Sequence, residues 1–324
     1  MRSEALKTVL TAVFCLTALP AFAAPLQKSE VSPAANWVAH IDLEAFRSSA
    51  IGKLILAELQ NQGIEAKLQE FVTIFSFHPL HDIRDVTVYG KGQDRSNAVA
   101  VFDGQFDPQK LLAIVRLNAQ YQEIPYKGAT LHRWEQEPKQ GRQTTGEQAA
   151  PQMMYGCICD GSHVVIGSGM ETVKQAVDTL KGQTTVTPAG LLSQISETQG
   201  TVFALVAATG VGEMAGQNPQ AALLRQTDSL TLAIGEIDGR FFGDLSLQGR
   251  SVEMAENMTK LLEGIIAMGE LSGSEQPRLI ELAKGIDVSR IDKTTRARLE
   301  TSVESVFQFV KEQWEQQRRK QDQP

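Results

Sequence analysis

Two cysteines separated by one residue give this sequence its most distinctive chemistry. Cys157 and Cys159 lie in an apolar stretch that we expect to form a strand, so both thiols point to one face. Such a pair could act as a redox dithiol or supply two ligands to a soft metal such as zinc or copper(I). His132, on the strand expected to pair with this one, and His163 could add imidazole nitrogen. Buried cysteines also fill cores as small apolar residues, and this alternative stays open.

A second candidate motif follows the apolar stretch Thr201–Ala208, which has the composition of a buried strand. Gly210, Gly212 and Ala215 match the G-x-G-x-x-A pattern, whose glycines let a backbone approach the pyrophosphate of a dinucleotide. The acidic residue that should end the next strand about 20 residues on is absent. Pro219 also interrupts the helix that should follow. We therefore expect a strand-to-helix turn here and no cofactor.

The other histidines and the carboxylates give weaker indications. His40 and Asp42 share one face of an expected strand, and His78 and His81 flank a proline turn, so either pair could bind a metal or exchange protons. Neither pair belongs to a metal-binding motif, and we expect local hydrogen bonds for both. Acidic residues are plentiful, but the sequence does not show which of them converge, so a hydrolase that uses two carboxylates stays an open alternative. No catalytic residue follows from these patterns.

The N-terminus predicts export. A basic start precedes the apolar run Thr8–Leu19, and Ala21-Phe22-Ala23 provides a small–x–small cleavage site. We expect cleavage between Ala23 and Ala24, so that residues 1–23 form a Sec-type signal peptide and the mature protein is periplasmic or secreted. The apolar run is too short to span a bilayer, and we expect no transmembrane helix in the mature chain.

The composition excludes several classes of protein. The 324-residue chain is 42% hydrophobic and 21% charged, as in globular proteins rather than disordered or fibrous ones. It holds 31 basic and 38 acidic residues, a net charge of −7. Because phosphate binding needs clustered Lys and Arg, we expect no nucleic-acid partner. Cys15 lies within the signal peptide, so two cysteines remain in the oxidising compartment expected for an exported protein.

Apolar periodicity and turn signals divide the rest of the chain into two similar units. The first should contain a strand at Trp37–Leu43, helices up to Phe75, a hairpin at 86–102, a helix opened by Asp107-Pro108, strands at 129–134 and 153–166, and a helix that Gly182 ends. The second should contain a strand at Thr201–Ala208, a helix near Gln220–Arg225, a hairpin turning at Asp238-Gly239, two helices up to Gly285, strands at 286–291 and 297–299, and a final helix. Ser168-x-x-Glu171 and Thr301-x-x-Glu304 have the pattern of matching capping boxes. The matched order predicts an internal duplication.

We therefore predict an α+β fold of two tandem related β-α-β-β-α-β-β-α units, with antiparallel-rich sheets and helices packed on one face. The expected segments are a signal peptide at 1–23, a linker at 24–35, a first repeat at 36–182 with a mobile loop at 136–152, a connector at 183–200, a second repeat at 201–318 and a polar tail at 319–324. Neither unit need be stable alone, which leaves a core shared by both as an open alternative.

Two local features accompany the duplicated layout. The strand Trp37–Leu43 runs into Ser48-Ser49-x-x-Gly52-Lys53, and a strand–Gly–x–x–Asp-Pro–helix step occupies Phe102–Lys110. In this layout the chain resembles a group of exported bacterial proteins of unknown function. The resemblance implies a fold and a location, and it implies no activity.

These observations favour a non-enzymatic exported protein that binds a ligand or a protein partner, with the groove between the repeats as the first place to look. One alternative is a thiol-redox or metal-handling protein that uses Cys157 and Cys159. The other is a hydrolase with carboxylates at the repeat interface. The sequence specifies neither the ligand nor the oligomeric state.

Overall fold

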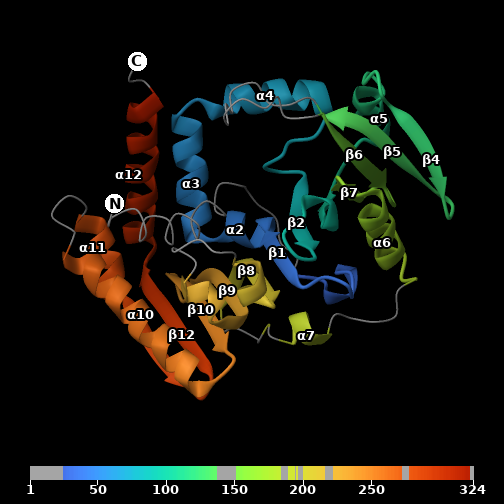
Figure 1. Ribbon diagram of the computed structural model, residues 1–324. Helices are drawn as coiled ribbons and strands as arrows, with labels where there is room; N and C mark the ends of the chain where they lie inside the picture. The colour runs from blue at the N-terminus through green and yellow to red at the C-terminus, as the bar shows by residue number, and fades with distance from the viewer. Residues whose placement is uncertain are drawn as a thin grey trace.

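The computed structural model describes residues 25–136, 151–183, 189–193, 195, 200–215, 222–271 and 277–321. The expected signal peptide, nearly all of the loop at 136–152 and most of the connector at 183–200 lie outside these residues. The described chain mixes helices with a large antiparallel sheet (Figure 1), which fits the predicted α+β class.

The sheet contains twelve strands within the described residues, in the order β11-β12-β10-β9-β8-β1-β2-β3-β7-β6-β5-β4. The strands of the first half are β1 (Trp37–Asp42), β2 (Ile83–Gly90), β3 (Ala98–Gly104), β4 (Gln122–Tyr126), β5 (Ala129–Gln136), β6 (Gln152–Ile158) and β7 (His163–Gly167). The strands of the second half are β8 (Thr201–Thr209), β9 (Thr227–Ile237), β10 (Arg240–Gly249), β11 (Ile286–Ile291) and β12 (Thr294–Ser302). Sequence patterns predicted most of these strands, but they missed β4 and indicated a single strand at 153–166, where the structure has β6 and β7.

The helices fall between the strands in both halves. The first half contains η2 (Lys28–Glu30), α2 (Leu43–Ser48), α3 (Ala50–Asn61), α4 (Ile64–Phe75), η3 (Arg95–Asn97), α5 (Pro108–Val115) and α6 (Met170–Leu180), and α7 (Ala189–Leu192) follows it. The second half contains α8 (Val211–Met214), α9 (Ala222–Arg225), α10 (Val252–Leu271), α11 (Pro277–Lys284) and α12 (Val303–Gln321).

The order of the strands is mirrored about the centre of the sheet. β1 and β8, the first strands of the two halves, pair antiparallel from Trp37↔Ala208 to Ile41↔Ala204. Outward from this pair, one side continues through β2, β3, β7 and β6, and the other through β9, β10, β12 and β11. The hairpin of β5 and β4 extends the first side beyond its counterpart.

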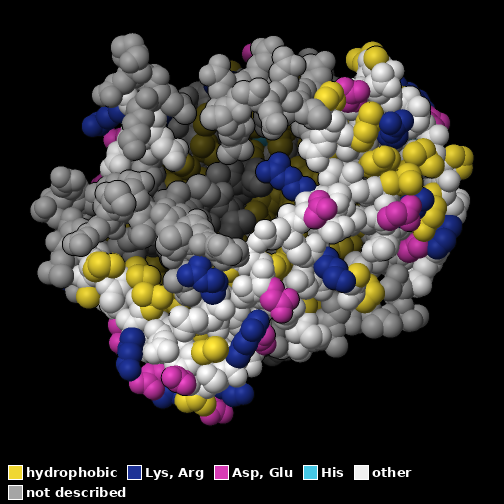
Figure 2. Space-filling model, viewed as in Figure 1, with side chains coloured by type: hydrophobic (Ala, Val, Ile, Leu, Met, Phe, Trp, Pro, Cys, Tyr) yellow, Lys and Arg dark blue, Asp and Glu magenta, His cyan; other side chains and the backbone are white. Residues whose placement is uncertain are grey.

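Basic and acidic side chains are interspersed over the described part of the surface seen in Figure 2. Apolar side chains with high exposure are dispersed through the chain, and include Leu117 after α5 and Ile291 at the end of β11. Within the described part of the chain, no helix combines the length and the apolar character needed to cross a bilayer.

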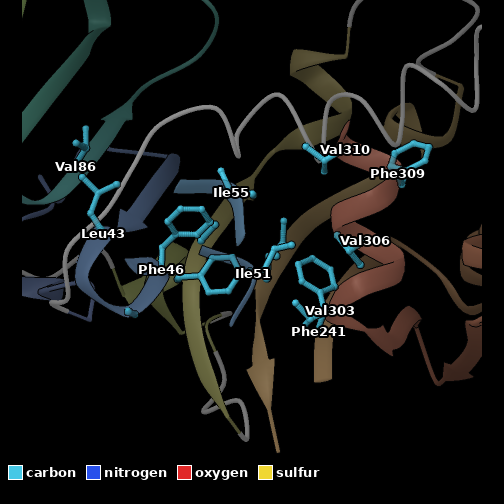
Figure 3. Packing of buried hydrophobic residues seen from close by; sticks show 14 of the residues in the cluster. Leu43, Phe46, Ile51, Ile55, Val86, Phe241, Val303, Val306, Phe309 and Val310 are labelled. Atoms are coloured by element: carbon cyan, nitrogen blue, oxygen red, sulfur yellow. The ribbon is translucent and has the colours of Figure 1, made fainter. Parts of the chain in front are cut away.

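One face of the sheet, which we call the helix face, carries the largest cluster of buried apolar residues. α2 and α3 of the first half contribute Phe46 and Ile51, and α12 of the second contributes Val306 and Phe309 (Figure 3). The Lys311 ammonium also lies 3.0 Å from a Glu58 carboxylate oxygen, which joins α12 to α3. Both halves therefore share one core, the alternative that the sequence left open.

The opposite face, which we call the strap face, is covered mainly in the first half. Val38, Val99 and Val165 point to this face and pack against α6 and α7. Residues 25–36, which we call the strap, cross the same face, and Val31 is buried in this cluster with 1% of its surface exposed. The expectation of helices on one face is therefore wrong for α6, because its apolar stripe packs on the opposite face from that of α12.

Several local signals are confirmed. Asp107 accepts hydrogen bonds from the Gln109 and Lys110 amides at the start of α5. Asp238 and Gly239 both have positive φ, as the turn between β9 and β10 requires. The two capping boxes are wrong by one residue each. The N-cap of α6 is Gly169, and the hydroxyl that accepts a hydrogen bond from an amide of the first turn of α12 belongs to Ser302.

Candidate functional site

The two cysteines lie together on the strap face at the end of β6. Both are free thiols, Cys157 buried and Cys159 half-buried. The Cys159 amide donates to the His163 carbonyl at 2.9 Å, so β7 places His163 beside the pair. Three of the four candidate metal or redox residues are therefore neighbours.

The two thiols perturb each other. A hydrogen bond from Cys159 lowers the pKa of the Cys157 thiol. The same hydrogen bond, together with burial, raises the pKa of Cys159. Cys157 is therefore the thiol that ionises first, although it has the more buried surface.

His132 belongs to a different environment. It pairs with Gly156 across β5 and β6, and side chains alternate along a strand, so its ring lies on the helix face, opposite Cys157. There its Nδ1 lies 2.8 Å from the Tyr121 hydroxyl, and the two rings stack. The predicted set of four residues is therefore divided. Within the described residues, no three His, Cys, Asp or Glu side chains are arranged as a metal site.

A row of ionisable side chains crosses four neighbouring strands of the strap face at the level of Cys159. Directly opposite partners in adjacent strands place these residues side by side: Asp42, Asp85, Asp103 and His163. Glu30 of η2 closes over the row from the strap, with its Oε1 3.8 Å from His163 Nε2. Like charges directly opposite each other in a sheet are destabilising, so this register needs compensation.

The members of the row other than Asp85 have hydrogen-bonding or charged partners. Asp42 accepts a hydrogen bond of 2.8 Å from the Ala45 amide and thereby caps α2. Asp103 pairs with the Arg84 guanidinium and lies 3.8 Å from His163 Nε2. The Asp160 carboxylate lies 2.8 Å from His163 Nδ1.

Asp85, between Asp42 and Asp103, has 6% of its surface exposed, and its carboxylate has no hydrogen bond or ion pair among the described residues. Burial raises its pKa to about 7, and the negative charges of Asp103, Glu30 and Asp42 add to this effect. Burial also raises the pKa of Glu30, and Asp103 and Asp160 contribute in the same direction. The row can therefore hold protons near neutral pH.

A pocket of about 270 Å³ opens beside the other end of the same strands. The strap forms one wall through Ser32, Ala34 and Ala35, and the first turns of α6 form the opposite wall through Glu171, Thr172 and Gln175. Residues at the β2–β3 turn complete it: Tyr89, Gly90, Lys91 and Asn97.

Tyr89, one of the lining residues, has an unusual hydroxyl group. It has 2% of its surface exposed, and its hydroxyl has no hydrogen-bond partner of ordinary geometry. Burial raises its pKa, while the Ser32 backbone acts in the opposite direction. Buried hydroxyls are normally hydrogen-bonded, so the Tyr89 hydroxyl is an exception beside the pocket.

The remaining candidates from the sequence have local roles. His40 Nδ1 lies 2.8 Å from the Thr87 hydroxyl, and the His78 and His81 rings lie 4.3 Å apart, near Arg47. The segment after β8 turns at Gly210, which has a φ of 67°, into a helix of only four residues. This agrees with the expected strand-to-helix turn.

The carboxylate row was missed because its members are far apart in sequence. The signal that could have revealed it is the position of Asp85 and Asp103 near the ends of two strands joined by a predicted hairpin. Placing Asp42 beside Asp85 also requires the strand order β1-β2-β3. That order is expected if strands consecutive in the sequence pair with each other. The members of this carboxylate row all belong to the first half.

No family model matches the chain, and none of the curated proteins matches it. Among solved structures, its neighbours are crystal forms of TP0453, a Treponema protein of unknown function. Form I has a TM-score of 0.45 and 12% identity, and the alignment covers 89% of this chain and 97% of that one. Form IV has a TM-score of 0.43 and 11% identity, and the alignment covers 92% and 99% of the two chains.

Proposed function

We propose that the protein is exported and binds a small polar ligand in the pocket between the strap and α6. The observation that carries this proposal is the pocket itself, whose lining includes Lys91, Asn97 and Gln175 beside Tyr89, a buried residue whose hydroxyl has no hydrogen bond of ordinary geometry. The export part rests on the signal-peptide pattern of residues 1–23.

The lining of the pocket supports a polar ligand. Lys91, Asn97 and Gln175 offer an ammonium and two amides at its rim. The charge of Glu171 is matched by Lys174, whose ammonium lies 2.7 Å from its carboxylate. A volume of about 270 Å³ is slightly below the range for drug-sized ligands, so a metabolite of amino-acid or monosaccharide size fits it best.

A thermal-shift screen tests the binding proposal. The mature protein, beginning at Ala24, is heated with separate amino acids, monosaccharides and small carboxylic acids at millimolar concentration. We expect at least one compound to raise the melting temperature, because a ligand that binds only the folded state stabilises it. Gln175→Trp, which fills the pocket mouth, should abolish the shift.

Gln109→Trp provides the matched control, because it places the same side chain at an exposed position in the first turn of α5, outside the pocket. It should retain the full thermal shift. A screen in which no compound stabilises the protein, or in which both variants respond alike, contradicts the pocket as the binding site.

A thiol function of Cys157 and Cys159 is the second candidate. The observation that favours it is two free thiols side by side on the strap face, where Cys159 lowers the pKa of Cys157. Thiol titration of the denatured protein, isolated from the cell envelope without reductant, tests it. Two free thiols without bound metal, unchanged after exposure to mild oxidants, would exclude a redox or metal role.

We also infer that the two halves arose by duplication of a strand framework. The mirrored order of β1, β2, β3, β7 and β6 against β8, β9, β10, β12 and β11 supports this. The closing helices are not part of the repeat, because α6 and α12 pack on opposite faces. Separate expression of complementary halves tests it: two related modules should reassociate into the intact sheet, whereas irreversible aggregation of both would count against it.

A further inference from the structure

The strap is held on the sheet by few polar contacts. The Lys28 ammonium donates to the Leu192 carbonyl at 3.3 Å, and Asn36 bonds the Gly92 amide and the Thr209 carbonyl where the strap meets β1. Between these two points, Val31 enters the core and Glu30 covers the carboxylate row. The docked strap therefore places a carboxylate over three others.

The balance of charge under the strap depends on protonation. The groups that face Asp85 are Asp42 from β1, Asp103 from β3, His163 from β7 and Glu30 from η2, with Arg84, Asp160 and Cys159 at the edge of the cluster. With every acid ionised, five carboxylates face one guanidinium and one imidazole. A proton on Asp85 removes the charge at the centre of the row, where the Asp85 carboxylate has no ion pair among the described residues.

We propose that Asp85 is a proton-operated latch for the strap: when Asp85 is protonated the strap stays docked, and when it ionises the repulsion on Glu30 releases residues 25–36 from the sheet. Because Ser32, Ala34 and Ala35 form a wall of the pocket, release dismantles that wall. An exported protein would thereby couple the occupancy of its pocket to the external pH. The latch itself does not depend on a ligand.

The direction of the effect follows from linkage. The pKa of Asp85 is about 7 with the strap docked and returns toward its ordinary value of 3.8 when the row is exposed to water. The docked state therefore binds more protons between these two values, and docking weakens as the pH rises through about 7. Between pH 5.5 and pH 8.5 the opening equilibrium of the strap should rise on the order of tenfold.

Hydrogen exchange measured by mass spectrometry tests the latch on the full mature chain without ligand. Exchange of peptides from residues 26–36 is followed at pH 5.5 and pH 8.5 and converted to protection factors, which removes the intrinsic pH dependence of exchange. We expect strap protection to fall on the order of tenfold at pH 8.5, while peptides from α12 stay much more protected than the strap at both pH values.

Asp85→Asn should keep the strap protected at both pH values, because the amide cannot ionise. Asp244→Asn is the matched control: Asp244 is equally buried but is held by Arg296 and Arg298, and its loss should leave the pH response of the strap unchanged. If Asp85→Asn fails to fold, Glu30→Gln on the strap should reduce the pH response. Equal strap protection at the two pH values in the unaltered protein, or an unaltered response in the folded variant, overturns the proposal.

Discussion

Two buried aspartates differ in how neighbouring side chains balance their negative charge. Asp244 on β10 receives Arg296 Nε at 2.8 Å and Arg298 Nη1 at 3.0 Å. Asp85 on β2 is as buried, and its carboxylate has neither an ion pair nor a hydrogen bond within the described residues. The first should stabilise the fold as a charged group, and the second should do so only when it is protonated.

The global stability should therefore fall with pH. For Asp85 the folded-state pKa of about 7 exceeds the ordinary 3.8, so its contribution is complete below 3.8 and is lost as the pH rises through about 7. At about 1.4 kcal/mol per pKa unit, the loss is at most about 4 kcal/mol. Urea unfolding of the mature protein at pH 5 and pH 8 should show the decline.

Asp85→Asn should be more stable than the unaltered protein at both pH values, and its advantage should be about 2–3 kcal/mol larger at pH 8 than at pH 5. Asp244→Asn should instead lose stability at both pH values, because it weakens the compensation of two arginines. If Asp85→Asn proves less stable at pH 8, Asp85 is not an uncompensated charge.

The pKa of Cys157 should depend on the neighbouring thiol of Cys159. Cys159→Ala should raise the pKa of Cys157, because the hydrogen bond that lowers it is removed. The pH profile of alkylation of Cys157 by iodoacetamide should then move to higher pH, as followed by peptide mass spectrometry. An unmoved profile would mean that the two thiols do not interact.

At the scale of elements, residues of one half cap a helix of the other. The Glu236 carboxylate on β9 accepts the Ala50 and Ile51 amides of α3 at 2.9 and 2.7 Å. Glu236→Ala should lower the free energy of unfolding by about 1–2 kcal/mol, because it removes a negative group from a helix N-terminus. Glu253→Ala, exposed in the first turn of α10, should cost less than about 0.5 kcal/mol in the same urea titrations. Equal losses of unfolding free energy in the two variants would indicate that Glu236 does not cap α3.

Much of the secondary structure could be predicted because its signals are local. The Ser49 and Gly52 pattern predicted nothing specific, yet the structure explains it: Ser49 caps α3, and a Cβ on residue 52 would lie 1.8 Å from the Phe46 carbonyl oxygen. β4 was missed because Pro125 disfavours a strand interior, and it lies at the sheet edge, where proline is tolerated.

The site could be predicted only in part, because register and layer are set by tertiary packing. The Cys-x-Cys spacing correctly placed Cys157 and Cys159 on one face. The register of β5 moved His132 to the other face, and no periodicity in the sequence reports which residue of β5 lies opposite Gly156. The same limitation concealed the alignment of Asp42, Asp85 and Asp103.

At the scale of the whole molecule, the shared core should make the protein unfold as one unit. Phe241 of the second half packs in the same cluster as Phe46 and Ile51 of the first. Phe241→Ala should destabilise the fold by about 3–4 kcal/mol, and hydrogen exchange should increase in α3 as much as in β10. Exchange that increases only in the second half would indicate two independent domains.

The central claim is that an exported protein carries a small polar ligand in the pocket beside the strap. Mass spectrometry of the protein isolated from the cell envelope tests it most directly, first under denaturing and then under native conditions. We expect a denatured mass beginning at Ala24, a native mass increased by one small molecule, and loss of that increase in Gln175→Trp. A denatured chain that retains residues 1–23 would show that the signal peptide is not removed, and a native mass equal to that of the bare chain would show that the pocket carries no ligand.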